Sequence, residues 1–356
     1  MRWIILLPAL QLLLTSINAL TIRVPNKVSV IQETVSVLVP LRNEAHNVFA
    51  LIESLKNQRS LSNVEYIFLD DNSEDESFEL LIQSTSGLAN FHVIKGLELP
   101  SGWIGKTWAL QQLLEASSGE IIVSIDADVR IQSDAISRSI TLLNASALDF
   151  ISPYPRQIAK TLGERLIQPL LQWSWMSTLI LTLAERTSFS SMAVANGQFF
   201  IVRRRALKAA NEFRAVSSAV LDDVYLARQL ISTGSRGVVV NGGDIAECRM
   251  YSSWREIEAG YGKSLHYAFG SKLATLFVVA FLFFTGIAPL VLALMGSIWG
   301  WIGFLLSVLS RVVSAIKSRA NIFDAIFHPV SMALLIYLIF YSYLMRGEIT
   351  WKGRQV

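Results

Sequence analysis

The stretch that decides the fold reads Ile121-Ile122-Val123-Ser124-Ile125-Asp126-Ala127-Asp128-Val129. Its first five residues have the apolar character of a buried strand, and two carboxylates follow where that strand ends. Carboxylate oxygens are hard ligands suited to Mg²⁺ or Mn²⁺, and an ion held by one or two of them keeps positions for water and substrate phosphates. We therefore predict that Asp126 and Asp128 hold a divalent metal, and that the substrate is a nucleotide diphosphate or its sugar ester.

Similar apolar runs precede this stretch and alternate with helix-patterned segments. The predicted strands cover residues 35–39, 64–69, 91–94 and 121–125. Such an alternation of strands and helices predicts an α/β domain with a mostly parallel sheet covered by helices. Ligands of these sheets bind beyond the carboxyl ends of the strands, so the functional residues are expected there.

Polar clusters follow three of the predicted strands at that end. They read Pro40-Leu41-Arg42-Asn43-Glu44, Asp70-Asp71-Asn72-Ser73 and Asp126-Ala127-Asp128. Because the carboxyl ends of parallel strands meet at one edge of a sheet, we expect the three clusters to converge. A simpler role also remains open, since Asp71, Asn72 or Ser73 is a good N-cap for the helix that follows.

The composition places part of the chain in a membrane. Of the 356 residues 52% are hydrophobic, and the mean hydropathy of +0.43 is high for a soluble protein. Uncharged stretches long enough to span a bilayer cover residues 3–22, 273–310 and 325–345. We predict an N-terminal anchor in residues 1–22, and a C-terminal region in residues 273–345 made of a hairpin that turns near Gly296 and one further span.

The N-terminal stretch has a second interpretation, because its apolar core and the small residues near Ala19 also resemble a cleaved secretory signal. Arg23 and Lys27 form a positive flank, which favours an uncleaved anchor and a cytoplasmic central domain in a multi-pass protein of the cell membrane. The same rule places Lys317 in the cytoplasm but then leaves Arg346 outside. The orientation of the last segments therefore stays open.

The charge and cysteine counts exclude other classes of protein. A net charge of +3 is too small and too spread to indicate nucleic-acid binding. One cysteine, Cys248, excludes an intrachain disulfide, and the four histidines lack the spacing of a zinc site.

A helix is expected near residues 160–185, with Trp173 and Trp175 in its middle. The many polar residues around this tryptophan pair are unusual for a spanning helix and suit one that lies at the level of the lipid headgroups. The alternative is an ordinary helix of the protein core, since aromatic residues at helical spacing commonly just pack.

Together these motifs resemble the membrane-associated glycosyltransferases of family 2, which have the GT-A fold. The resemblance covers residues 33–265 and rests on the stretches 35–44 and 69–73 and on the acidic pairs. Residues 102–109 and Arg249-Met250-Tyr251 are similar to the branch that glycosylates lipids, as is the ending Trp351-Lys352-Gly353-Arg354. The implied architecture is a GT-A nucleotide-diphospho-sugar transferase domain with N-terminal and C-terminal transmembrane helices.

For the donor site, the resemblance implies that Glu44 and Asp71 contact the uridine and that Asp126 faces the nucleotide-sugar while Asp128 holds the metal. The remaining donor-side residues are Pro40, which shapes its loop, Arg42 in the same loop, and Lys106 and Arg249, which add positive charge near the diphosphate. An alternative for Lys106 is an ordinary surface lysine.

For catalysis, the resemblance implies that Asp223 is the general base, with Asp222 in support. The family usually has Glu at the position of Asp222, and the pair has a simpler alternative as a helix N-terminal cap. Gly197 and Gln198 resemble the strand that lines the acceptor side, while Trp173 and Trp175 are expected to hold the apolar part of the acceptor.

One motif of the family is missing. Processive polymerases and ceramide-type members carry Gln-x-x-Arg-Trp after the acidic pair, whereas this chain has Arg249, Tyr251 and, in reversed order, Trp254-Arg255. The departure argues against a processive synthase, and Arg249 is our candidate for the missing diphosphate contact.

The resulting hypothesis is an inverting, metal-dependent transfer of one sugar, with UDP-glucose as the expected donor, to a membrane lipid such as a carotenoid, hopanoid or ceramide-like lipid. A polyprenyl-phosphate sugar synthase is the enzymatic alternative. A membrane-tethered protein that binds nucleotide or lipid without catalysis is the alternative from another class.

Overall fold

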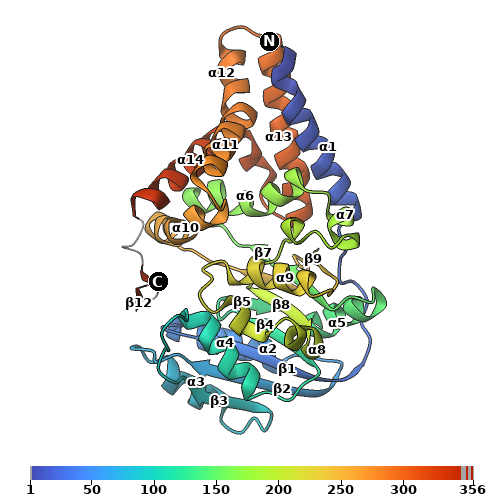
Figure 1. The fold of residues 1–356 in the computed structure, drawn as a ribbon, viewed down its shortest axis with the longest axis vertical. Coiled ribbons are helices and arrows are strands. Elements are labelled where there is room, and N and C mark those ends of the chain that lie inside the picture. The colour runs from blue at the N-terminus through green and yellow to red at the C-terminus, as the bar shows by residue number, and fades with distance from the viewer. Residues whose placement is uncertain (1, 346–349, 352–353, 356) are drawn as a thin grey trace. The chain divides into compact units, whose positions relative to one another are not determined.

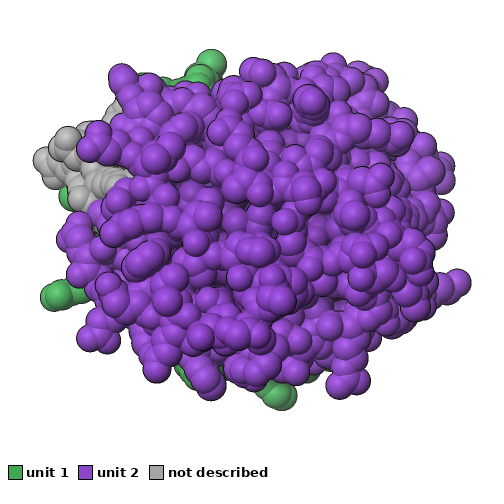
Figure 2. Space-filling model, turned by 90° about the horizontal axis from the view of Figure 1, so that it is seen from below, with its two compact units in different colours: residues 1–22, 157–182, 249–356 green, residues 23–156, 183–248 purple. Residues whose placement is uncertain are grey.

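The computed structural model describes residues 2–345, 350–351 and 354–355. Lys352 and Gly353 of the C-terminal motif therefore lie outside the described residues, as does Arg346. The chain divides into two compact units, coloured in Figure 2. Unit 1 consists of Met1–Ile22, Gln157–Thr182 and Arg249–Val356, and unit 2 of Arg23–Arg156 and Leu183–Cys248.

Unit 2 is built on a seven-stranded sheet of order β3-β2-β1-β4-β8-β6-β9 (Figure 1). Its strands are β1 (Ile31–Leu41), β2 (Leu61–Asp70), β3 (Phe91–Lys95), β4 (Ile121–Ile125), β6 (Phe150–Tyr154), β8 (Phe199–Arg203) and β9 (Gly237–Asn241). Parallel pairs join β1 to β2 and β4, β2 to β3, and β6 to β9, whereas β8 runs antiparallel to β4 and β6. The sheet is therefore mostly parallel, as the sequence predicts.

The remaining elements of unit 2 connect and cover these strands. They are α2 (Ala45–Lys56), α3 (Ser77–Thr85), α4 (Gly105–Glu115), α5 (Ala135–Ala145), η2 (Ser190–Met192), α8 (Arg204–Ala209), η3 (Glu212–Val216), α9 (Asp222–Ser232), β5 (Val129–Ile131) and β10 (Ala246–Cys248). The short strands β5 and β10 pair antiparallel. Two further elements, β7 (Arg156–Gln157) and α7 (Leu181–Arg186), lie where the chain passes between the units.

The central strands are buried on both faces because helices cover the sheet. All five residues of β4 are buried, and Leu38, Ile122 and Phe200 from three neighbouring strands share one apolar core with Leu110 and Leu113 of α4. Strands that are enclosed on both faces read as continuous apolar runs. The four predicted strands are confirmed at their places in the sequence. The antiparallel direction of β8 and the strands β6 and β9 are additions that the sequence pattern did not indicate.

Unit 1 is helical. Its elements are η1 (Arg2–Ile5), α1 (Leu6–Thr21), α6 (Leu162–Thr178), α10 (Trp254–Ala268), α11 (Lys272–Leu282), the π-helical turn η4 (Phe283–Ile287), α12 (Ala288–Leu294), α13 (Ile298–Ser318), η5 (Ile322–Phe327) and α14 (His328–Leu344). The short strands β11 (Thr350–Trp351) and β12 (Arg354–Gln355) pair near the C-terminus. In Figure 1, α1 lies alongside α13, and α12 turns back onto α13.

Four helices in the described part of the chain are long and apolar enough to cross a membrane. They cover Arg2–Thr21, Lys272–Leu294, Ile298–Ser318 and Ile322–Leu344. The second and third form the expected hairpin, which turns at Gly296 with φ +87°, a backbone angle that favours glycine. Unit 1 thus contains the predicted N-terminal segment, hairpin and last segment as candidate spans.

A small polar network joins three helices inside unit 1. Ser310 Oγ lies 3.0 Å from Thr15 Oγ1 and accepts a hydrogen bond from Trp173 Nε1 at 2.9 Å. Thr15 and Ser310 are fully buried, and Trp173 is 2% exposed. In a bundle whose surroundings are apolar, such hydrogen bonds between helices help to fix which faces meet. The hydroxyl of Ser310 therefore ties α1 and α6 to α13.

The surroundings of the two tryptophans favour the second interpretation of their helix. Trp173 is 2% and Trp175 is 7% exposed. Trp173 belongs to an apolar core with Ile257, Met332 and Leu338. α6 is thus packed as a core helix of unit 1 at this point.

We expect Ser310→Ala to destabilise unit 1 by about 1 kcal/mol, because both inter-helix hydrogen bonds are lost. The thermal unfolding midpoint of the full chain in detergent measures the effect. Ser16→Ala is the matched control, since Ser16 Oγ donates only to Leu12 O within α1, at 2.7 Å. A midpoint for Ser310→Ala that is no lower than that of Ser16→Ala would contradict the bridging role.

Candidate active site

Arg42 fastens the loop after β2 to the end of β1. Its guanidinium is 4% exposed. Nη1 donates to the main-chain oxygens of Asp71, at 2.7 Å, and Asn72, at 2.6 Å, and Nη2 donates to Glu74 at 3.1 Å. The backbone N–H of Asp71 in turn donates to Leu41 O at 2.8 Å. Arg42 therefore holds the two predicted donor loops together through their backbone.

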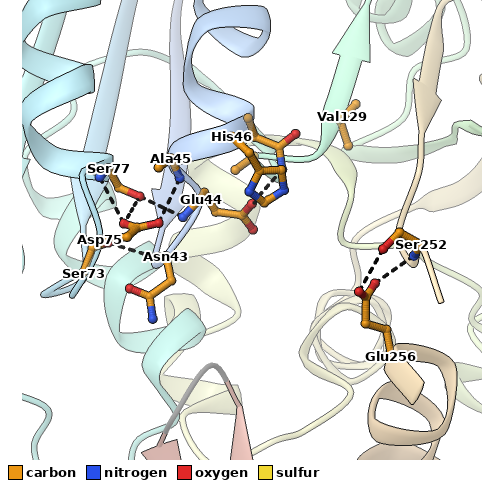
Figure 3. Close-up of polar contacts among 12 residues, drawn as sticks. Asn43, Glu44, Ala45, His46, Ser73, Asp75, Ser77, Val129, Ser252 and Glu256 are labelled. Carbon is orange, nitrogen blue, oxygen red and sulfur yellow. Dashed lines mark hydrogen bonds and ion pairs between the residues drawn. The ribbon is translucent and has the colours of Figure 1, made fainter. Parts of the chain in front are cut away.

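A second set of bonds joins the same loops on the side shown in Figure 3. Asp75 accepts hydrogen bonds from the backbone of Ala45, at 3.1 Å, and from the backbone and hydroxyl of Ser77. The hydroxyl of Ser77 also accepts from Glu44 N at 2.8 Å. The side chain of Glu44 is 13% exposed. These contacts fix the backbone that carries Glu44, a predicted donor contact.

The helix-capping alternative for the second polar cluster is wrong for the helix that follows it. α3 begins at Ser77, and its N-cap position is Glu76, which makes no side-chain capping bond. Asp71 is instead 1% exposed, and Ser73 Oγ accepts from Asn43 N at 2.9 Å. The second polar cluster thus contacts the loop after β1, as predicted for clusters that meet at one edge of the sheet.

Lys106 lies within the acidic cluster, so the surface-lysine alternative is wrong. Its Nζ is 2.7 Å from Asp126 Oδ1 and 2.9 Å from Asp126 Oδ2. Burial lowers the pKa of Lys106, but the negative charges of Asp126, Asp222 and Asp223 outweigh it and raise the pKa above its usual value. The ammonium thus stays charged and offsets the repulsion among these carboxylates.

Asp128 presents a carboxylate that suits a divalent cation. Burial, together with the charges of Asp126 and Glu44, raises the pKa of Asp128 to about 6. Within the described residues its Oδ1 is buried and has no hydrogen-bond partner. An unsatisfied buried carboxylate oxygen is costly unless a cation or donor meets it.

The few carboxylates available suit an Mg²⁺ or Mn²⁺ ion that completes its coordination with water and substrate, rather than a metal ion held by protein ligands alone. Among the described residues, no group of three or more His, Cys, Asp or Glu side chains is placed to hold an ion. Mg²⁺ in particular is usually bound through one or two carboxylates and substrate phosphates, with water in the remaining positions. Asp128, with Asp126 beside it, can supply that protein share.

Asp223 stands at the start of α9 and contacts the segment that leads into β8. Its Oδ2 accepts from Gly197 N and its Oδ1 from Val224 N, both at 2.8 Å. Burial and the neighbouring charge of Asp222 raise the pKa of Asp223 to about 6. The carboxylate lies in the first turn of α9, and the N-cap position, Leu221, makes no side-chain capping bond. Asp223 therefore bonds to a segment outside α9 as well as to an N–H of the helix's own first turn.

Gly197, next but one before β8, lies against both Asp223 and Lys106. A Cβ added to Gly197 would lie 3.1 Å from Lys106 Nζ and 3.3 Å from Asp223 Cβ. Both contacts are tighter than ordinary van der Waals separation, so the glycine allows the backbone to approach the charged pair. The structure thus brings Lys106, Asp126, Gly197 and Asp223 into one cluster.

Gln198 contacts Cys248, a residue that the sequence analysis did not assign to the site. Gln198 O accepts from Asp126 N at 3.0 Å, and its side-chain Nε2 donates to Cys248 Sγ at 3.1 Å. Gln198 and Cys248 are 4% and 1% exposed. The sequence offered one signal for Cys248, which is its position directly before the Arg249-Met250-Tyr251 motif.

Arg249 and the two tryptophans belong to unit 1. The guanidinium of Arg249 donates to Glu164, from Nε at 3.3 Å and from Nη2 at 3.1 Å. Burial would raise the pKa of Glu164, but bonds from Arg249, Lys160 and Thr161 bring it down to about 2. Glu164 also closes the capping box of α6 with Thr161. Arg249 is thus engaged in a structural ion pair, and its diphosphate role stays a prediction.

Comparison with known proteins shows what the chain resembles. Residues 36–210 match the sequence profile of Glycosyl transferase family 2. A 4,4'-diaponeurosporenoate glycosyltransferase from Staphylococcus haemolyticus is 23% identical, over 91% of this chain and 88% of the relative. A beta-monoglucosyldiacylglycerol synthase from Trichormus variabilis is 27% identical, over 55% of this chain and 41% of that protein.

A solved structure shares the fold over nearly the whole length. It is the mannosyltransferase PcManGT from Pyrobaculum calidifontis in complex with GDP-Man and Mn²⁺. The TM-score is 0.54 at 15% identity, covering 96% of this chain and 98% of the other. The predicted GT-A-like fold is confirmed, and the terminal helices are candidate membrane spans.

We expect Lys106→Met to destabilise the full chain by about 3 kcal/mol at pH 7.5, because it leaves buried carboxylates without their counter-charge. Thermal unfolding in EDTA measures the loss. Lys56→Met is the control, since Lys56 and its partner Glu53 are 51% and 45% exposed and such a pair contributes about 0.5 kcal/mol or less.

The deficit of Lys106→Met should shrink at pH 5. Below about pH 6 Asp128 and Asp223 take up protons, so the repulsion that Lys106 offsets becomes weaker. An equal deficit at pH 7.5 and pH 5, or none at either, would contradict the central role of this ammonium.

Proposed function

Because the chain is a glycosyltransferase with a family 2 domain, we propose that it transfers a single sugar from a nucleoside-diphosphate sugar to a membrane lipid. The proposed donor is UDP-glucose, and the anomeric configuration is inverted. The observation that carries this proposal is one cluster of interacting charges. Lys106 pairs with Asp126 and interacts with the charge of Asp223. Asp126 in turn interacts with Asp128, whose buried Oδ1 has no hydrogen-bond partner among the described residues.

On the donor side, Asp128 would hold Mg²⁺ or Mn²⁺, with Asp126 beside it. The ion, when bound, stabilises the negative charge that develops on the leaving diphosphate. The loops fastened by Arg42 and Asp75 present Glu44 and Asp71 to the nucleoside. Rigid loops keep these contacts in register, which such a displacement requires.

The reaction is a single displacement at the anomeric carbon. The acceptor oxygen forms the new bond to that carbon while the bond to the diphosphate oxygen breaks, and the nucleoside diphosphate leaves with the electron pair. Asp223 takes the acceptor proton. The carboxylate is suited to this role, because its raised pKa of about 6 makes it a stronger base than an exposed aspartate while it is still ionised at neutral pH.

The lipid acceptor is supported by two observations. Two relatives are named for the lipids diaponeurosporenoate and diacylglycerol, and unit 1 has four candidate membrane spans. A carotenoid, hopanoid or ceramide-like lipid with a hydroxyl or carboxyl group is the acceptor class that we propose. The proposed location of unit 2 is the cytoplasmic side of the membrane, which the positive flank after the first candidate span, Arg23 and Lys27, supports.

Transfer of labelled sugar into total membrane lipids tests the proposal. The purified full chain is given labelled UDP-glucose, UDP-galactose or GDP-mannose, with EDTA, Mg²⁺ or Mn²⁺. We expect metal-dependent labelling that falls at least about a hundredfold in Asp128→Ala and Asp223→Asn. Asp134→Asn, which changes a half-buried carboxylate paired with Arg138 at 3.6 Å, should label normally.

Two other outcomes would each favour one of the alternative functions. Partial labelling by Asp223→Asn would favour a polyprenyl-phosphate acceptor, which needs no strong base. Absence of label with every donor would indicate a protein that binds nucleotide or lipid without catalysis.

The pH dependence of kcat provides an independent test of Asp223. A base must be ionised, so at saturating metal and substrate kcat should fall about tenfold per pH unit below pH 6 and level off above it. Any residual activity of Asp223→Asn should lack this acid limb. A flat profile of the wild type from pH 5 to 7.5, with the protein folded throughout, would exclude Asp223 as the base.

A further inference from the structure

Cys248 lies against the carboxylate that the proposed function assigns to the metal. In the antiparallel pair of β10 and β5, Cys248 stands opposite Val129, the residue after Asp128. The thiol is 1% exposed and makes a side-chain hydrogen bond with Asp128. It is therefore a neighbour of Asp128 by both backbone register and side-chain contact.

The thiol is held in place from its other side. Gln198 Nε2 donates to Cys248 Sγ at 3.1 Å. Gln198 is itself fixed, because its N–H donates to Asn196 Oδ1 at 2.8 Å and its carbonyl accepts from Asp126 N at 3.0 Å. One glutamine thus anchors the backbone of Asp126 and, through the thiol, the side chain of Asp128.

The two hydrogen bonds of Cys248 make its sulfur an acceptor from Gln198 and its S–H a donor to Asp128. An amide N–H that donates to Sγ occupies a sulfur lone pair, so the single S–H proton is left to donate to Asp128. Oδ1 of Asp128 stays buried without a hydrogen bond among the described residues. A hydrogen bond from a neighbouring group orients a carboxylate, as is usual for carboxylates that bind metals, and it leaves the unpaired Oδ1 for a cation.

We propose that Cys248 is a positioning residue for the metal site, orienting Asp128 so that Oδ1 faces the divalent cation, with Gln198 setting the direction of the thiol. This inference rests on the proposed function, since it assumes that Asp128 holds the ion. The sulfur does not bind the metal. Mg²⁺ and Mn²⁺ prefer oxygen ligands, whereas a sulfur ligand would select softer ions.

Direct measurement of Mn²⁺ binding tests the proposal without relying on turnover. The full chain in detergent is titrated with Mn²⁺ in the presence of UDP, and free Mn²⁺ is followed by electron paramagnetic resonance. Cys248→Val removes the donor at similar volume, and we expect a Kd at least about tenfold higher. Cys248→Ser keeps a donor and should stay within about threefold of the wild type.

Ile131→Val is the matched control, because it removes one methyl group from the same strand pair, at the residue opposite Ala246. It should leave the Kd unchanged. Thermal midpoints in EDTA verify that each variant is folded. Gln198→Leu should raise the Kd in the same direction as Cys248→Val, since the thiol then loses the bond that directs it.

The outcomes separate this inference from the proposed function. A folded Cys248→Val that binds Mn²⁺ as the wild type does, or a wild type that does not bind Mn²⁺, overturns the positioning role. A Cd²⁺-over-Mn²⁺ preference that is lost in Cys248→Ser would show direct ligation by sulfur and overturns it as well. A Kd shift as expected, in a protein that transfers no sugar to lipid, would uphold the positioning role and refute only the proposed function.

Discussion

The acidic cluster at the edge of the sheet depends on a partly buried cation, the ammonium of Lys106. Its Nζ lies within 3 Å of the Asp126 carboxylate and interacts electrostatically with Asp222 and Asp223. Carboxylates in a partly buried site repel one another by several kcal/mol when no opposite charge lies between them. By offsetting that repulsion, Lys106 lets the end of β4 and the start of α9 approach each other. Gly197, which has no side chain, leaves room for this approach.

The topology of the sheet explains why residues so far apart in sequence meet there. β1, β2 and β4 run parallel, so their carboxyl ends carry the three polar clusters to the same edge. β8 is antiparallel to β4, with Phe199 opposite Ile125. The start of β8 therefore lies beside the end of β4, which brings Gly197 and Gln198 to Asp126. A parallel strand at this position would have placed its opposite end at the site.

The sequence predicts the local parts of this arrangement better than the distant ones. The strands and the acidic clusters are visible because apolar runs and the residues that follow them are local patterns. The reversal of β8, the burial of Lys106 and the contact of Cys248 with Asp128 depend on partners 20 to 120 residues away, and no local pattern contains that information. The burial of Trp173 is a similar case, since a tryptophan in a polar-looking helix is enclosed only once α13 and α14 pack on it.

The partly buried carboxylates of Asp128 and Asp223 also lower the stability of the fold at neutral pH. The folded-state pKa values of Asp128 and Asp223, about 6, lie above those of an unfolded aspartate. The protonated carboxyls therefore stabilise the fold fully at a pH below the pKa of the unfolded aspartate, and this stabilisation is lost as the pH rises through about 6. At neutral pH each ionised group lowers the free energy of unfolding by on the order of 1 to 3 kcal/mol. A cation bound at Asp128 would offset part of that cost, since any ligand that binds only the folded state stabilises it. Metal binding and the stability of unit 2 are thus linked through the same carboxylate, and Cys248 and Gln198 act on both.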